Sequence, residues 1–412
     1  MRNYLVVTFA YWVFTLTDGA LRMLVLLHLH GLGYTPITLA SIFLLYEFFG
    51  VTTNFTAGWV GARFGLKSTL WSGLSLQILA TSVLAWQAAS LTVPLVIAMQ
   101  GLSGIAKDLT KMSAKSYVRL LVPRGKADEA AHSRRLLHWV AALTGSKNTL
   151  KGVGFFLGGY LLSNWGFQVS NLIMAGALLI ALLVSCWKLP AALGKTAVIP
   201  RLRDVLRTDR RVFHLSWARL FLFGARDAWF AIGLPIFLVD QLDWSQAAVG
   251  AFLASWVIGY GLVQASAPRL LGMQRRADAG ALIRWTLVLL LPILGLCTFL
   301  LVSPESTWIA SGLVLGLAAF GFLFAGSSAL HSFLILHLSE DENVSLRVGF
   351  YYMANAMGRF LGVLASGIAY QWGGGGSTGL LACLGVTLGF LLISSLGARA
   401  LQSSIVSDRV PT

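Results

Sequence analysis

Charged residues are scarce in this chain of 412 residues, because Asp, Glu, Lys and Arg make up 11% of it, against roughly 25% in soluble globular domains. So low a charge content excludes a water-soluble enzyme or a nucleic-acid-binding protein. Cysteine is scarce as well: Cys186, Cys297 and Cys383 stand singly, with no C-x-x-C motif and no His at ligand spacing. This pattern argues against a metal site or a disulfide framework. We therefore expect three buried, inert thiols and no cofactor.

Long apolar runs are what the sequence has in abundance. Hydrophobic residues make up 57% of the chain, and its mean hydropathy is +0.75. The Lys and Arg residues, which give a formal net charge of +15, lie between apolar runs of about twenty residues, a length that spans a bilayer. The chain is therefore expected to be an all-α protein embedded in a lipid bilayer, with no nucleic-acid partner.

Twelve apolar runs predict twelve transmembrane helices, at approximately 4–28, 37–60, 68–87, 93–116, 136–162, 168–188, 212–239, 246–266, 280–302, 308–338, 344–370 and 380–400. The loops that would lie on one side of the membrane contain no Lys or Arg. The opposite loops hold Arg63, Lys67, Arg124, Lys126, Arg134, Arg135, Arg275 and Arg276. By the positive-inside rule, both termini are expected in the cytoplasm.

The chain divides into two similar halves. A longer basic connection at 190–211 is expected to be a cytoplasmic linker between a six-helix bundle at 1–189 and a second one at 212–412. Asn148 and Asn355 occupy matching places in the fifth and eleventh helices. Parallel six-helix repeats related by an axis along the membrane normal are a known plan of transporters. We expect two pseudo-symmetric halves around a central cavity.

Charges inside the apolar runs point to the site. A charged side chain at mid-bilayer costs roughly 2.5–3.5 kcal/mol on insertion scales, so such charges usually face a cavity and mark function. Lys107 and Lys111 are four residues apart, as are Lys147 and Lys151, so each pair occupies one helix face. Lysine offers a point charge and arginine a planar fork for oxyanions. The predicted substrate-binding residues are Arg22, Lys107, Lys111, Lys147, Asn148, Lys151, Arg226 and Arg359.

Four intramembrane acids are the candidates for coupling transport to protons: Asp18, Glu47, Asp108 and Asp227. Asp18 is expected to pair with Arg22, Asp108 with Lys111, and Asp227 with the adjoining Arg226. Glu47 is the preferred proton carrier, because its neighbours on the same helix face include no cation. Alternatively, the substrate exchanges for inorganic phosphate or leaves down its own gradient, and Glu47 only hydrogen-bonds a neighbouring helix.

Cations near helix ends allow a simpler interpretation. Arginine and lysine there can extend to the interface or form ion pairs that hold helices together. For Lys115, Arg219 and Arg347, which lie near the predicted cytoplasmic ends, this structural role is the alternative to a role in transport.

The loop after the second helix resembles a signature of the major facilitator superfamily. Gly58, Arg63, Gly65 and Lys67 match four positions of G-x-x-x-D-R-x-G-R-R, whereas Ala62 replaces the usual Asp. The resemblance implies the fold of that superfamily and a cytoplasmic gate at these four residues, but the missing Asp puts the motif's charge relay in doubt.

A second motif lies in the fifth helix. Residues 154–159, GFFLGG, are similar to the antiporter motif G-P-x-x-G-G, with Phe155 in place of Pro. Ordinary packing of small residues between helices explains the same segment equally well.

Beyond the superfamily, the chain resembles the organoarsenical efflux permeases of bacterial arsenic-resistance operons. The resemblance lies in segments that hold most of the intramembrane charges: 11–24, 45–50, 101–115, 143–148, 150–159 and 219–227. It implies a transporter and not an enzyme, which exports 1-arseno-3-phosphoglycerate across the bacterial inner membrane by alternating access and confers arsenate resistance. It also implies a functional link to a glyceraldehyde-3-phosphate dehydrogenase, which makes this unstable ester from arsenate. Protons are the coupling ion that we expect, by antiport.

Other functions stay open on the sequence. The same charges suit a transporter or exchanger of ordinary organophosphates or phosphoglycerates. A membrane-embedded sensor or enzyme would need a soluble signalling domain or a nucleophile beside a base, and Ser103, Ser113 and Ser116 have no His within a helical turn. A thiol-based arsenite pump is disfavoured because the cysteines stand singly.

Overall fold

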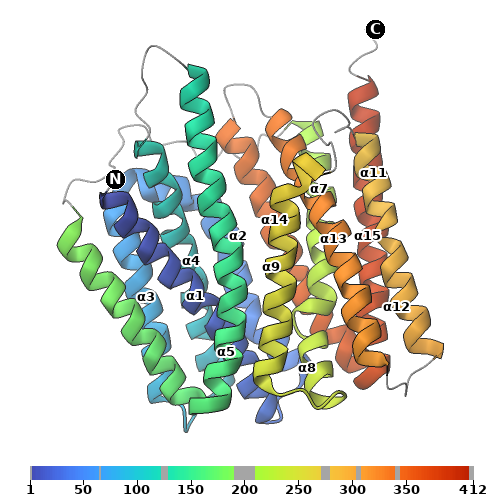
Figure 1. Cartoon of the computed structure of the whole chain (residues 1–412), viewed down its shortest axis with the longest axis horizontal. Coiled ribbons are helices and arrows are strands. Elements are labelled where there is room, and N and C mark those ends of the chain that lie inside the picture. The colour runs from blue at the N-terminus through green and yellow to red at the C-terminus, as the bar shows by residue number, and fades with distance from the viewer. Residues whose placement is uncertain are drawn as a thin grey trace. The chain divides into compact units, whose positions relative to one another are not determined.

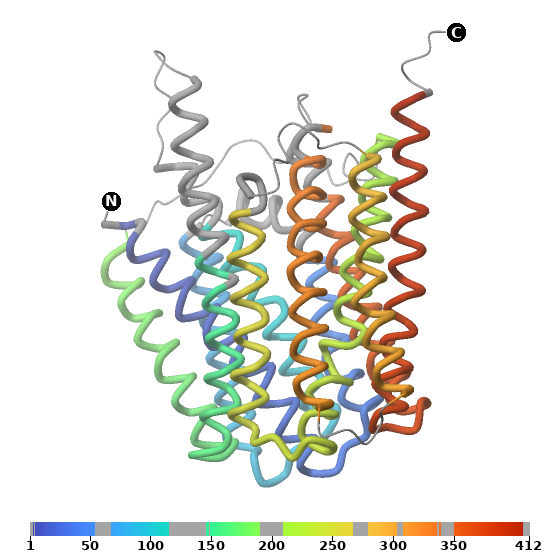
Figure 2. Tube along the Cα trace, turned by 45° about the vertical axis from the view of Figure 1, so that its right-hand side comes forward, coloured from blue at the N-terminus to red at the C-terminus, as the bar shows by residue number. Residues whose placement is uncertain are grey.

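The structure is a computed structural model that describes residues 2–64, 66–121, 129–189, 209–270, 279–302, 308–338 and 344–407. Within these ranges the side chains are described except at 2, 4, 54–64, 66, 115–121, 129–145, 148, 267–270, 336–337, 344–349 and 407. The regular structure in the described ranges is all α-helical (Figures 1 and 2). The helices are α1 Arg2–Gly31, α2 Pro36–Phe64, α3 Leu66–Trp86, α4 Val93–Leu121, α5 Glu129–Lys188, α7 Arg210–Phe230, α8 Gly233–Asp240, α9 Gln246–Leu270, α11 Ala279–Val288, α12 Leu290–Val302, α13 Ile309–His337, α14 Val344–Trp372 and α15 Gly376–Ser407.

Each apolar run that predicts a membrane helix falls within helical structure. Nine helical stretches among the described residues are long and apolar enough to cross a membrane. The more charged α4 and α14 are not among these nine. The expectation of an all-α membrane protein is confirmed for the part of the chain that the structure describes.

α5 contains two of the predicted helices in one continuous stretch. Gly166 interrupts it with φ 70° and ψ 178°, and the chain reverses its direction there (Figures 1 and 2). This backbone conformation is essentially confined to glycine. The predicted helices at 136–162 and 168–188 are therefore the two arms of α5.

We expect Gly166→Ala to lower the free energy of unfolding by about 1–3 kcal/mol, because a residue with a Cβ is strained at this φ and ψ. Space is not the obstacle, since nothing lies within 4 Å of an added Cβ. The thermal unfolding midpoint of the purified protein measures the effect. Gly176→Ala is the matched control, because Gly176 has equally open surroundings within a regular arm of α5. Equal midpoints for the two variants would contradict the proposed strain.

Two predicted helices are each broken into two. The run at 212–239 forms α7 and α8, and the run at 280–302 forms α11 and α12. Pro235 and Pro292 explain the breaks, because proline lacks an N–H donor and its ring crowds the carbonyl four residues earlier. At the first break, the Ser366 hydroxyl accepts hydrogen bonds from the backbone N–H groups of Ile232 and Gly233, at 3.3 and 3.0 Å.

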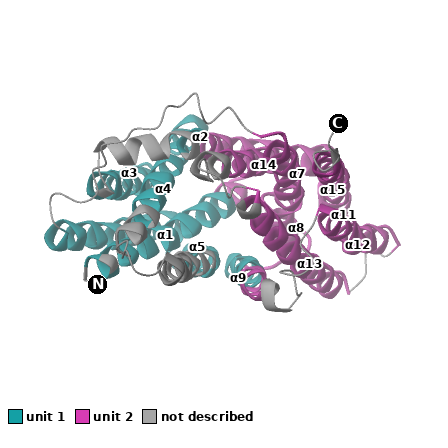
Figure 3. Ribbon diagram, turned by 90° about the horizontal axis from the view of Figure 1, so that it is seen from above, with its two compact units in different colours: residues 1–28, 52–201, 246–258 teal, residues 29–51, 202–245, 259–412 magenta. Residues whose placement is uncertain are grey.

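The chain forms two compact units (Figure 3). Unit 1 comprises Met1–His28, Thr52–Arg201 and Gln246–Ile258, and unit 2 comprises Leu29–Val51, Leu202–Ser245 and Gly259–Thr412. Residues 29–51 and 246–258 thus group differently from the division at 1–189, 190–211 and 212–412. That division into bundles stays a prediction, and most of its linker lies outside the described residues.

In each unit, the helices that contain charged residues are held in place by packing against neighbouring helices. In unit 1, buried Phe14, Leu74, Ala106 and Leu178 join α1, α3, α4 and the second arm of α5 in one core. In unit 2, α7 packs against α14 and α15. A Cβ added to Gly362 of α14 would lie 2.7 Å from the Gly224 carbonyl oxygen of α7. Small residues therefore bring the backbones of α7 and α14 close together.

Candidate functional site

In unit 1, α1 and α5 touch backbone to backbone beside the charged residues. A Cβ added to Gly19 would lie 2.8 Å from the Lys151 carbonyl oxygen, and one added to Gly154 would lie 2.5 Å from the Leu16 carbonyl oxygen. Only glycine permits so close an approach. Gly19 is flanked in α1 by buried Asp18 and, one turn on, by half-buried Arg22. Residues from two predicted site helices therefore line one contact between α1 and α5.

The segment 154–159 serves this helix packing. A Cβ at Gly158 would collide with the Ala20 carbonyl oxygen of α1, and one at Gly159 with the Gln246 carbonyl oxygen of α9. The observed contacts support the packing interpretation of the motif.

The lysine pair of α5 lies beside the same contact. Lys147 and Lys151 are both half-buried, and the Lys151 ammonium lies 5.6 Å from the centre of the Phe155 ring. Next to Lys147, the Ser146 hydroxyl accepts a hydrogen bond of 3.0 Å from the Trp12 indole of α1. Both lysines are thus held where α5 meets α1.

The charged face of α4 contains a buried carboxylate. Asp108 is 1% exposed and accepts hydrogen bonds from the Lys111 ammonium at 3.2 Å and from the Thr53 hydroxyl at 2.5 Å. The predicted pairing of Asp108 with Lys111 is confirmed. Half-buried Lys107 precedes Asp108 and adds a further cation to this part of α4. The predicted pairing of Asp18 with Arg22 stays a prediction.

In unit 2, Glu47 of α2 forms an ion pair with Arg359 of α14. A guanidinium nitrogen of Arg359 lies 2.8 Å from Glu47 Oε2, with Glu47 fully buried and Arg359 half-buried. The expectation that Glu47 has no cationic partner is wrong. The neighbours of Glu47 on its own helix are indeed uncharged, but the cation comes from a different helix. The premise that made Glu47 the preferred proton carrier therefore no longer holds.

Arg226 and Asp227 of α7 form the second ion pair of unit 2. The Arg226 guanidinium lies 2.6 Å from Asp227 Oδ1, as the sequence predicts for adjoining residues. The guanidinium also lies 4.9 Å from the Phe223 ring centre and 5.7 Å from that of Phe324. Aromatic faces and one carboxylate thus hold Arg226 in place, with its side chain still 16% exposed.

Arg219 is more deeply buried than its predicted position near the cytoplasmic end of its helix suggested. It is 5% exposed, so it does not extend to the interface. Its guanidinium donates to Asn355 Oδ1 of α14 at 3.0 Å and to the Ser328 hydroxyl of α13 at 3.0 Å. No Asp or Glu among the described side chains forms an ion pair with it. The spacing could have indicated that Arg219 is buried, because Arg219 lies two turns before Arg226 on the same face of α7.

We expect Arg219→Lys to lower the free energy of unfolding by about 1.5–3 kcal/mol, because a lysine cannot make the forked contacts to Asn355 and Ser328, and hydrogen bonds to charged groups contribute that much. The thermal unfolding midpoint of the purified protein reports the loss. Arg210→Lys is the control, since Arg210 is exposed at the start of the same helix. If the two variants unfold alike, the Arg219 contacts do not stabilise unit 2.

A His–Asp pair in unit 2 was also not predicted. His30 Nε2 at the end of α1 lies 2.7 Å from Asp240 Oδ1 at the end of α8. It joins ends of two helices that are far apart in sequence, so no local motif could have indicated it.

Several predicted site residues lie outside the described side chains: Asn148, Gly58, Arg63 and Gly65, together with Lys115 and Arg347. Of the predicted gate, the structure describes Lys67. Its ammonium donates a hydrogen bond of 2.8 Å to the Leu189 carbonyl oxygen and lies 4.3 Å from the Trp71 ring centre. The gating role of all four motif residues stays a prediction.

The cysteines differ from the expectation in part. Cys383 is buried and Cys297 is half-buried, but Cys186 is exposed. Cys186 shares an exposed apolar face of α5 with Leu183 and Trp187, as on a lipid-facing surface. Among the described side chains, no group of three or more His, Cys, Asp or Glu is arranged to hold a metal ion.

Residues 7–335 match the Major Facilitator Superfamily in sequence. The chain belongs to the Major Facilitator Superfamily. A solved structure described as "Structural insights into substrate recognition in proton dependent oligopeptide transporters" is similar with a TM-score of 0.70, at 12% identity, covering 99% of each chain. No curated protein matches the chain in sequence. At this identity the structural likeness shows the fold alone, and the predicted Major Facilitator Superfamily fold is confirmed.

Membership of the Major Facilitator Superfamily suggests why charged residues lie within the apolar helices. The chain is a multi-pass membrane protein of a class of secondary transporters. Charged side chains at membrane depth in such proteins mark substrate and ion pathways. The cations within α1, α4, α5, α7 and α14 are therefore candidates for lining such pathways.

Proposed function

We propose that this protein exports a small phosphorylated organoarsenical anion, 1-arseno-3-phosphoglycerate, from the bacterial cytoplasm across the inner membrane. One observation carries the proposal: within apolar helices of both units, partly or fully buried cations outnumber acids among the described side chains. Unit 1 holds Arg22, Lys107, Lys111, Lys147 and Lys151 against Asp18 and Asp108, and unit 2 holds Arg219, Arg226 and Arg359 against Glu47 and Asp227. A surplus of desolvated positive charge favours a polyanionic substrate.

The side chains present suit this ligand. Phosphate and arsenate groups offer oxygen pairs that an arginine guanidinium binds in two-pronged fashion, and lysine contributes a mobile point charge. Arg226 and Arg359 have side-chain exposures of 16% and 17%, so neither side chain is fully enclosed. We expect these two arginines of unit 2 to bind one anionic end of the substrate.

The arsenical substrate and the outward direction rest on the resemblance to organoarsenical efflux permeases. The segments that carry it include Asp18 to Arg22, Lys147, Lys151 and Arg226, all of which belong to the proposed pathway. In this proposal, a glyceraldehyde-3-phosphate dehydrogenase first makes the ester by accepting arsenate in place of phosphate. The transporter then exports the ester. Removal of the unstable ester before it hydrolyses prevents the return of arsenate to the cytoplasm.

Ordinary organophosphates or phosphoglycerates form the second candidate substrate class. The same cations suit them, because organophosphates carry a phosphate group and phosphoglycerates carry a carboxylate as well. Selectivity for the arsenical is therefore the point that an experiment must decide.

Arsenate tolerance of bacterial cells tests the proposal. Cells that lack other arsenic resistance and their own glyceraldehyde-3-phosphate dehydrogenase would express this protein alone, the dehydrogenase alone, or both. We expect tolerance and lower cellular arsenic only with both proteins. Tolerance from the transporter alone would contradict the dependence on an enzymatically made ester. A lack of any effect, together with uptake of 3-phosphoglycerate, would favour the second candidate.

A further inference from the structure

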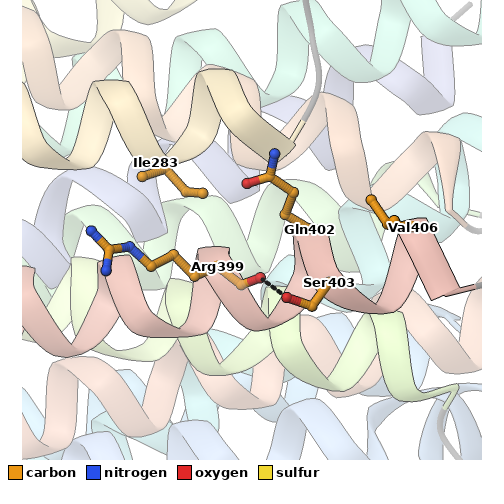
Figure 4. A pocket seen from close by; sticks show the side chains of 5 residues that line it. All are labelled: Ile283, Arg399, Gln402, Ser403 and Val406. Carbon is orange, nitrogen blue, oxygen red and sulfur yellow. Dashed lines mark hydrogen bonds between the residues drawn. The ribbon is translucent and has the colours of Figure 1, made fainter.

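A groove lies on unit 2 along the last turns of α15, where that helix packs against α11 (Figure 4). It has a volume of about 650 Å³ and is lined by Ile283, Arg399, Gln402, Ser403 and Val406. The four residues of α15 are spaced so that they share one helix face, and all four are exposed.

The groove lies at the depth of lipid headgroups. The apolar stretch Gly376–Val406 has 31 residues, which at about 1.5 Å per residue reach beyond a hydrocarbon core of about 30 Å. Exposed Trp372 precedes this stretch and suits the opposite interface. Arg399 therefore lies near the end of the hydrocarbon core, and the groove residues that follow it lie past that end. They lie at the end where α11 begins after basic Arg275 and Arg276.

The lining combines the two chemistries of a phospholipid. Arg399 has no ion-pair partner among the described residues, and its guanidinium extends along α15 past Ile283 and away from Gln402 and Ser403 (Figure 4). The Gln402 amide and the Ser403 hydroxyl add hydrogen-bonding groups, and Ser403 donates to the Arg399 carbonyl oxygen at 3.2 Å. Ile283 and Val406 supply the apolar surface that acyl chains contact.

We propose that this groove binds the headgroup of an anionic phospholipid, with the lipid phosphate on Arg399. Basic pockets between membrane helices on the cytoplasmic side favour such headgroups over zwitterionic ones. Exposed Arg284, next to Ile283 in sequence, adds positive charge at the same end of α11. This site is separate from the transport pathway proposed above, so either proposal can fail alone.

Binding of phosphatidylglycerol to the purified full-length protein in detergent tests this site, by native mass spectrometry and by the shift of the thermal unfolding midpoint. We expect phosphatidylglycerol to bind and to raise the midpoint, and phosphatidylcholine at the same concentration to do neither. Arg399→Gln should weaken phosphatidylglycerol binding about fivefold, since one basic residue near a membrane surface contributes about that factor. Gln402→Trp, which fills the groove without changing charge, should weaken it as well.

Arg210→Gln is the matched control, because it removes one exposed positive charge from α7, outside the groove. Equal binding of phosphatidylglycerol by Arg399→Gln and Arg210→Gln would overturn the proposal. A midpoint shift with inorganic phosphate that equals the shift with phosphatidylglycerol would assign the groove to a free phosphate. Equal binding of phosphatidylcholine would show that Arg399 does not select the headgroup.

Discussion

Replacement of both lysines on one face of α5, by Lys147→Met with Lys151→Met, should reduce transport about 100-fold or more. Each hydrogen bond to a charged group contributes about 1.5–3 kcal/mol, and the double change removes two cations from the proposed substrate path. Insertion into the membrane should not be impaired. Each lysine in the apolar region costs roughly 2.5–3.5 kcal/mol on insertion scales, and its replacement by methionine removes that cost. Initial transport rates in vesicles, normalised to the amount of inserted protein, measure the effect.

The matched control for these lysines is Lys188→Met. Lys188 is exposed at the end of the second arm of α5, so the same chemical change there should leave transport intact. Lys151→Arg keeps the charge and should retain part of the activity. Normal transport by the Lys147→Met, Lys151→Met variant would exclude an electrostatic role for this face of α5.

The ion pair between Glu47 and Arg359 should respond very differently to single and double substitution. Arg359→Met leaves the fully buried Glu47 without its cation, and breaking a buried pair in this way costs about 3–5 kcal/mol of stability. Addition of Glu47→Gln to the same chain should restore most of that loss, because no buried charge then remains. Thermal unfolding midpoints of the three variants provide the test. If the double variant is no more stable than Arg359→Met, the two side chains do not interact.

The same pair bears on proton coupling. Protonation of Glu47 would remove the charge that Arg359 pairs with, so the state of this pair depends on proton binding. The antiport expected from the sequence rested on a Glu47 without a cation, so with the observed pair, coupling through Glu47 stays a prediction. Glu47→Gln should retain counterflow exchange but lose the response of export to an imposed pH gradient. An unchanged response in that variant would show that Glu47 is not the coupling residue.

Local features of the sequence were enough to predict the fold and two of the ion pairs. Apolar runs determine where helices form, and the pairs Asp108 with Lys111 and Arg226 with Asp227 lie within one helical turn. The reversal at Gly166 fell between two runs that were already expected to be separate helices. In each case the interacting groups are close in sequence.

Contacts between distant helices could not be predicted in the same way. Glu47 and Arg359 meet because α2 and α14 pack together in unit 2, and helical periodicity does not say which helices become neighbours. The contact of Arg219 with Asn355 depends in the same way on glycines that bring α7 and α14 close. The sequence did not indicate that Arg219 is buried. Its place near the end of the predicted helix suggested a position at the membrane interface instead.

Direct transport into everted membrane vesicles tests the central claim. The vesicles would contain this protein, and the surrounding solution would contain glyceraldehyde-3-phosphate, NAD⁺, arsenate and the dehydrogenase. We expect arsenic to accumulate inside only when all four components are present, and not in vesicles with Lys147→Met and Lys151→Met. Arsenic accumulation without the dehydrogenase, or accumulation of 3-phosphoglycerate without any arsenic, would contradict export of the arsenical ester.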